Sequence, residues 1–312
     1  MNLKGCYMRH NVCFFTDAGH FTLGWCKTIW RISMKSQTKK ANIVLATTFM
    51  AAMPVAAFAA PITDLDNQPW QRSLTTEGGT AEIVDLTGLG GNLENNAPLP
   101  TGAVKLQTGS ASGSRAEIQL LPDGGFGTVN DLFNSNLSFG YSMYKGGTGA
   151  AEPAPSFKMQ FYNPEPVQDR DGYMELVFEP YWNQPGSEGA SSAVPMGDWI
   201  DYSVDITSGL LWSTGGFGTG NSGGGPPLLT LQDWLSTLNS DFGDASLFGI
   251  SLGLGSNTPD QIGYVDNVRV NAGNYSRTFD FEASSEVPAP ASLPLLLIGL
   301  LGVAAKRLRR HS

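Results

Sequence analysis

The sequence predicts an all-β fold, an antiparallel sandwich of two sheets with one short helix, and three observations favour it. Apolar and polar residues alternate along many short segments, as half-buried strands require. Turn sequences rich in glycine separate these segments, and only one stretch has clear helical periodicity. A signal helix is expected before this domain and a transmembrane helix after it.

The strands and the helix can be placed individually. The helix is expected from Leu231 to Leu238, with Thr230 as its N-cap and Asp233 in the capping-box position. Many short strands with few helices favour a jelly roll, because a parallel sheet would need crossover helices that the sequence lacks. The clearest alternating runs span residues 116–120, 157–161, 174–178 and 200–206.

The amino end has the features of a secretory signal peptide. Lysines at 35, 39 and 40 precede an apolar stretch from residue 41 to 58, and Ala57 and Ala59 are the small residues that signal peptidase reads. Residues 34–59 are therefore expected to be a signal peptide cleaved after Ala59. Residues 1–33 are expected to be a mis-called start or a disordered segment, because they would place the apolar stretch too far from the start.

The exported domain, residues 60–286, contains neither cysteine nor histidine. This excludes Ser-His-Asp and Cys-His catalysis, histidine-ligated metals and structural disulfides within it. Eight of the chain's 19 Lys and Arg fall in this range with 27 of its 28 Asp and Glu, so its net charge is −19. We expect no nucleic-acid partner, because phosphate binding depends on clustered basic residues. Such an acidic surface can also serve solubility alone.

The last segment, residues 287–312, combines a short proline motif, an apolar run from Leu293 to Ala305 and a basic end. It resembles the PEP-CTERM sorting domain of Gram-negative bacteria, with Ala289 where that family most often has glutamate. The resemblance implies recognition by an exosortase at the inner membrane, in hosts that make exopolysaccharide. An ordinary C-terminal membrane anchor is the alternative. The motif residues are Val287, Pro288, Ala289 and Pro290, and the basic stop consists of Lys306, Arg307, Arg309 and Arg310.

The stretch from Ser246 to Glu282 resembles the closing strands of jelly-roll domains, and its Val-Asp-Asn-Val strand resembles lectin-like and carbohydrate-binding sandwiches. Within it, Asp266 shares parity with Tyr264 and Val268, which places a carboxylate on an apolar face. Either Asp266 and Asn267 accept backbone N–H bonds, or Asp266 belongs to a calcium site.

Calcium is the one cofactor that the sequence suggests. If the first and last strands lie side by side, carboxylates at the two ends of the domain could meet and supply oxygen ligands. No segment has a complete calcium-loop spacing. The candidate ligands are Asp64, Asp66, Asp266, Asp280 and Glu282.

Aromatic residues beside amides are the candidate ligand-binding groups, since a flat ring suits stacking on a sugar. Buried packing is the competing role for each of them. The candidates are Tyr181, Trp182, Asn183 and Trp212.

Two functions are compatible with these features. The first is a non-catalytic protein of the cell surface or extracellular matrix that binds polysaccharide or has a structural role, processed by signal peptidase and an exosortase through an inner-membrane-anchored intermediate. The second is a secreted glycoside hydrolase with paired carboxylates. Glu175 and Glu179 share a strand face about 13 Å apart, which is too far for either hydrolase mechanism, whereas carboxylates on different strands could still meet. The first function is preferred, and no catalytic residue is assigned.

Overall fold

The computed structural model describes residues 60–284, apart from 67–68, 148, 169–171 and 257, together with three short strands near the N-terminus. The chain divides into two units, residues 1–55 and 56–312. In the first unit, β1 (Tyr7–Arg9), β2 (Val12–Asp17) and β3 (His20–Gly24) form an antiparallel sheet in that order.

The signal peptide and the sorting tail predicted above lie outside the described residues, so both stay predictions. This includes the cleavage residues Ala57 and Ala59, the motif at 287–290 and the basic stop. Within the part that the structure describes, no helix is long and apolar enough to cross a bilayer.

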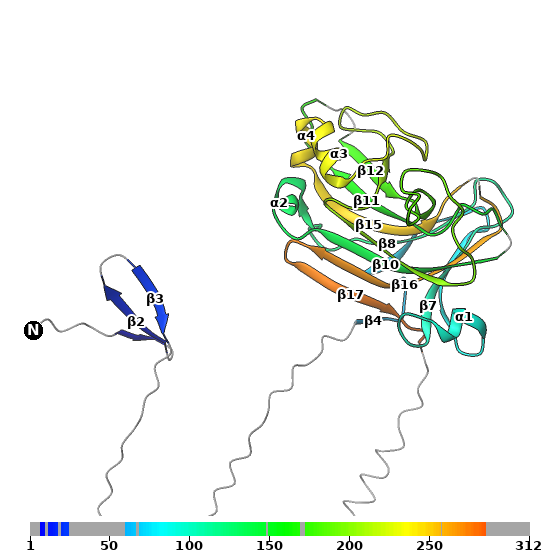
Figure 1. The fold of residues 1–312 in the computed structure, drawn as a ribbon, viewed down its shortest axis with the longest axis horizontal. Coiled ribbons are helices and arrows are strands. Elements are labelled where there is room, and N and C mark those ends of the chain that lie inside the picture. The colour runs from blue at the N-terminus through cyan, green and yellow to red at the C-terminus, as the bar shows by residue number, and fades with distance from the viewer. Residues whose placement is uncertain are drawn as a thin grey trace, which may run out of the picture. The chain divides into compact units, whose positions relative to one another are not determined.

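The second unit contains two sheets of seven strands each, which Figure 1 shows as stacked layers. Sheet I has the order β13 (Trp199–Asp205), β10 (Ser138–Gly147), β16 (Gln261–Ala272), β17 (Tyr275–Phe281) and β4 (Ala60–Ile62), with β7 (Gly102–Gln107) pairing with β16 and with β6 (Thr80–Asp85). Sheet II has the order β14 (Leu211–Ser213), β12 (Tyr173–Phe178), β11 (Ser156–Tyr162), β15 (Ser246–Leu254), β8 (Arg115–Leu120) and β5 (Trp70–Thr76), with β9 (Gly127–Thr128) pairing with β15. The predicted two-sheet fold is confirmed.

The alternation in the sequence decides which side chains enter the core. On β12, Met174, Leu176 and Phe178 are buried between the sheets, while Glu175 and Glu179 lie on the outer face. At one end of the core, Trp70 makes edge-to-face contacts with Phe279 and Phe281, at ring-centroid distances of 5.5 and 5.4 Å. The core thus joins strands of both sheets.

The predicted helix is present as α3 (Leu231–Thr237). The Thr230 side chain accepts a hydrogen bond from the Asp233 N–H at 3.2 Å and donates one to the Asp233 carboxylate at 2.7 Å. The prediction of a single helix was wrong in number. The structure also has α1 (Gly91–Asn95), α2 (Val129–Phe133), α4 (Ser240–Asp244) and the 3₁₀ turn η1 (Pro180–Trp182). The helix α2 begins with the same capping pattern, in which Thr128 caps Asp131.

The first and last strands of the domain lie side by side, which is the condition that the calcium prediction set. Strand β4 pairs with β17 in parallel, with Ile62 opposite Phe281. The Glu282 N–H then donates to the Ile62 carbonyl at 3.0 Å. The two ends of the domain therefore meet at one edge of sheet I.

Candidate functional site

The outer face of sheet II carries a polar groove with a volume of about 540 Å³. Neighbouring strands form its floor: β8, β15, β11, β12 and β14 lie side by side, and Figure 1 shows most of them as one layer. Two loops around Glu152 and Gly224 form its rim. We call it the outer-face groove. The residues that carry its chemistry are Glu117, Glu152, Lys158, Glu175, Glu179, Tyr181, Trp212 and Thr214.

An ion pair holds the middle of the groove. The Lys158 ammonium on β11 contacts the Glu117 carboxylate on β8, and the Ser73 hydroxyl donates to the same carboxylate at 3.0 Å. Burial lowers the pKa of Lys158, but the carboxylates of Glu117 and Glu175 outweigh it and raise that pKa overall. Lys158 is therefore charged at neutral pH and fixed in position.

Glu179 is the groove's most perturbed acid. Burial raises the pKa of its carboxyl to about 7, and the nearby Lys158 ammonium and Trp212 indole oppose that rise. Glu175 is held differently, because its carboxylate accepts hydrogen bonds from Gln160 at 3.2 Å and Tyr173 at 2.8 Å. Glu179 therefore changes protonation near neutral pH.

Glycine on β15 shapes the floor. A Cβ at Gly253 would lie 2.9 Å from the Ala116 carbonyl oxygen and 2.9 Å from Cγ of Glu117. A larger residue would therefore displace Glu117 from its place over β15. The missing side chain lets the Glu117 side chain lie across the strand toward Lys158 on β11.

Two of the four predicted ligand residues line the outer-face groove. Tyr181 and Trp212 do so, and Trp212 lies opposite Val177 in the sheet. Trp182 and Asn183 have structural contacts: the Trp182 indole donates to the Gly224 carbonyl at 2.8 Å, and Asn183 donates to the Glu179 carbonyl at 2.9 Å. The Tyr181 hydroxyl donates to the same Gly224 carbonyl at 3.1 Å, so Tyr181 has a structural contact as well. These contacts hold the rim loops. Ligand binding by any of the four stays a prediction.

The predicted calcium ligands are only partly brought together. Asp280 and Glu282 lie close enough to interact, and burial followed by Glu282 raises the pKa of Asp280 to about 6. Asp66 instead pairs with Arg72, and the Asp64 carboxylate accepts the Asp66 N–H at 2.8 Å. Among the described residues, no three acidic, histidine or cysteine side chains are grouped so that they could hold a metal ion. Calcium binding stays a prediction.

Asp266 is fully buried and accepts the Phe281 N–H at 3.1 Å through Oδ1. This is the backbone-bonding alternative given above. The parity argument behind it was wrong, because the pairing of β16 with β10 shifts register between Asp266 and Arg269, so that Val265 and Val268 are both in the core and Tyr264 is not. Its Oδ2 atom has no hydrogen-bond partner. Burial, with Asp280 and Glu282 adding to it, raises the pKa of Asp266 to about 7.

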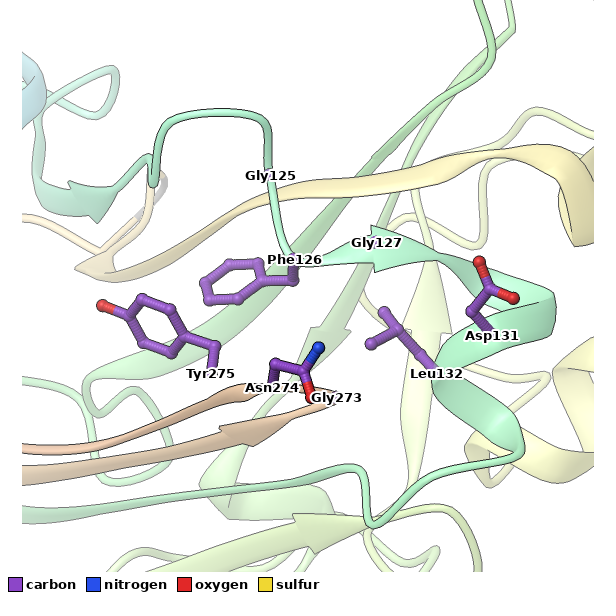
Figure 2. Close-up of a pocket in the computed structure, with 8 residues that line it drawn as sticks. All are labelled: Gly125, Phe126, Gly127, Asp131, Leu132, Gly273, Asn274 and Tyr275. Carbon is purple, nitrogen blue, oxygen red and sulfur yellow. The ribbon is translucent and has the colours of Figure 1, made fainter. Parts of the chain in front are cut away.

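A second cavity of about 490 Å³ lies between α2 and the turn that joins β16 to β17. Figure 2 shows the Phe126 and Tyr275 rings beside each other at one end and Leu132 and Asp131 at the other. Asp131 is the charged side chain among its lining residues, and it already bonds to Thr128 at the start of α2. The outer-face groove, with six charged side chains, is the better candidate for a polar ligand.

Glu117, Lys158 and Glu152 belong to the site but are not among the residues that the sequence predicts for it. The alternation placed the first two on the polar face of their strands, opposite Ile118 and Met159. That signal identifies a surface position but not its neighbours, because the strand order decides that β8 and β11 both flank β15.

Comparison with known proteins gives no family. No model of a protein family matches the chain, and no curated sequence does. Among solved structures, a family 11 carbohydrate-binding module of the cellulosomal cellulase Lic26A-Cel5E of Clostridium thermocellum is 11% identical, with a TM-score of 0.36, over 74% of this chain and 99% of that one.

Two further structures are similarly remote. TmCBM61 in complex with β-1,4-galactotriose is 10% identical, with a TM-score of 0.28, over 66% of this chain and 89% of that one. An exo-β-agarase is 14% identical, with a TM-score of 0.34, over 67% of this chain and 24% of that one. Values this low carry no argument about function, which therefore depends on the chemistry of the groove.

Proposed function

We propose that residues 60–286 form an exported domain that binds polysaccharide non-catalytically in the outer-face groove. The observation that carries the proposal is the composition of this groove. It brings the Trp212 ring on β14 and the Tyr181 ring in the 3₁₀ turn η1 together with fixed charged groups over one face of sheet II. Rings suit the apolar face of a sugar, and fixed polar groups suit its hydroxyls.

The charge of the groove limits the class of polysaccharide that it can bind. Glu117, Glu152, Glu175 and Glu179 face only two cations, Arg115 and Lys158. An acidic polymer would meet repulsion there and from the net charge of the whole domain. The proposal is therefore for neutral glycan.

A glycoside hydrolase is the second candidate, because Glu179 has the raised pKa that a general acid needs. The acid that shares its strand face, Glu175, is about 13 Å away by strand rise, and the Glu117 carboxylate is paired with Lys158. Binding is therefore favoured over hydrolysis.

One experiment separates the two candidates. The full chain in detergent is incubated with cellulose, mixed-linkage β-glucan, β-1,4-galactan, agarose, β-1,4-mannan and alginate, and both retained protein and released reducing ends are measured. Retention on a neutral polymer without new reducing ends supports the proposal. New reducing ends that disappear with Glu179→Gln would establish the hydrolase instead, and no retention on any of these polymers would refute binding.

For localisation, we propose export followed by display at the cell surface or in the extracellular matrix of a Gram-negative bacterium. The support is the signal-peptide pattern and the tail at 287–312 that resembles the PEP-CTERM sorting domain. Mass spectrometry of the secreted protein tests this. We expect an N-terminus at Ala60 and loss of the tail, and a cytosolic protein with both ends intact would contradict export.

A further inference from the structure

A group of aromatic side chains lies on the same face of sheet II, beyond the end of the outer-face groove. Tyr162 and Tyr173 are directly opposite each other on β11 and β12, and they are 45% and 40% exposed. Phe248 lies next to them, with its ring centroid 6.2 Å from that of Tyr173. We call these three residues the aromatic platform.

A β-bulge turns Phe248 to this face. On β11, Gln160 pairs with Gly249 and Phe161 pairs with Leu247, so Phe248 is the extra residue of β15. Its neighbours Leu247 and Ile250 remain buried in the core. Without the extra residue, regular alternation could not bury both Leu247 and Ile250, which are three residues apart, and Phe248 would point into the core on the same side as Ile250.

The aromatic platform is continuous with the outer-face groove. Glu175 lines the groove, and its carboxylate accepts the Tyr173 hydroxyl at 2.8 Å. Val177, opposite Trp212, lies four residues further along β12 than Tyr173, which is about 13 Å by strand rise. Trp212 and Tyr173 thus stand at two ends of one strip, with Glu175 between them.

We propose that the aromatic platform is a second subsite for the glycan held in the outer-face groove, so that the domain binds an internal stretch of a chain several sugars long. This inference rests on the proposed function and adds the length of the ligand to it. Partly exposed rings at both ends provide stacking surfaces, and the polar middle, with Glu175 and Lys158, provides hydrogen bonds to hydroxyls. If the outer-face groove were the only binding site, a short oligosaccharide would bind as tightly as a long one.

Calorimetric titration of the full chain with disaccharides and hexasaccharides tests the inference. The probes are β-1,4-linked gluco-, galacto- and manno-oligosaccharides. We expect the best hexasaccharide to bind at least roughly 10-fold tighter than its disaccharide, because two stacking sites are occupied. Tyr173→Ala and Phe248→Ala should each weaken hexasaccharide binding roughly 3- to 10-fold and leave disaccharide binding unchanged.

Two further variants serve as controls. Tyr173→Phe keeps the ring and should retain most of the length dependence, whereas Tyr264→Ala, on the outer face of sheet I, should change nothing. Equal affinity for both lengths, or unchanged hexasaccharide binding in both alanine variants, would overturn the inference while leaving the proposed function intact. Absence of binding by every oligosaccharide would overturn both.

Discussion

Replacing the buried carboxylate of Asp266 with an amide should make the domain more stable at alkaline pH. Asp266 is fully buried on β16, where its Oδ1 accepts the Phe281 N–H and the Asn267 N–H also lies close enough to lower its pKa. In Asp266→Asn, the side-chain oxygen can keep that bond while the charge disappears. Ionised Asp266 is therefore a cost to the folded state that the variant removes.

The size of the effect follows from the pKa. Burial raises the pKa of Asp266 from 3.8 to about 7 in the folded protein. At about 1.4 kcal/mol per unit, the upper bound is about 4 kcal/mol. Coupling to Asp280 and Glu282 spreads this over several groups, and the new amide N–H group needs a partner. We therefore expect a gain of about 2 kcal/mol.

The sign follows from linkage. Because the folded-state pKa lies above the unfolded value, the contribution of Asp266 to stability is complete below about pH 4 and is lost as pH rises through about 7. The wild-type protein should therefore be less stable at pH 8 than at pH 5. Asp280, with its pKa raised to about 6, acts in the same direction, so Asp266→Asn should reduce the slope without abolishing it.

Urea unfolding at pH 5 and pH 8, with chelator present, measures the effect. Asp123→Asn, at an exposed turn, is the matched control and should follow the wild type at both pH values. A wild-type free energy of unfolding that does not fall between pH 5 and pH 8 would contradict a raised pKa for Asp266. So would an Asp266→Asn variant that is less stable than the wild type by the same amount at pH 8 as at pH 5.

Three further predictions concern other charged groups. If calcium binds near Asp266, adding it at pH 8 should raise the melting temperature of the wild type but not of Asp266→Asn; equal responses in differential scanning fluorimetry would argue against that site. Lys158→Met should destabilise the domain by about 3 kcal/mol in urea unfolding, because Glu117 is left buried without its cation; a loss below about 1 kcal/mol would mean that solvent replaces the ammonium. Alginate should not compete with a bound neutral glycan at low salt, and competition in a displacement assay would refute the charge argument.

The fold class could be predicted from the sequence because each strand of a sandwich has alternating apolar and polar residues, which is a local pattern. Met174, Leu176 and Phe178 revealed the inner face of β12 directly. The Thr230 and Asp233 capping pair likewise marked α3. The same pattern at Thr128 and Asp131 marked α2, but a five-residue helix has too little periodicity to stand out.

The site was less predictable because it depends on which strands are neighbours. The aromatic side chains of Trp212 and Tyr181 are the basis for predicting them as ligand-binding residues, and both line the groove. Glu117 and Lys158 are far apart in sequence and meet only because β8 and β11 flank β15. The position of Phe248 on the outer face depends on a β-bulge, and no local pattern in the sequence predicts that bulge.

The most direct test of polysaccharide binding is a comparison of two tryptophan variants. Trp212 lies in the outer-face groove and Trp199 on the outer face of sheet I, and both are partly exposed. The assay is a calorimetric titration of the full chain with the neutral glycan to which the wild type binds most tightly. Trp212→Ala should bind this glycan roughly 10-fold or more weakly than the wild type, since stacking and contact area disappear together. Trp199→Ala should bind like the wild type. Equal affinities for wild type and Trp212→Ala would show that the glycan does not lie in this groove.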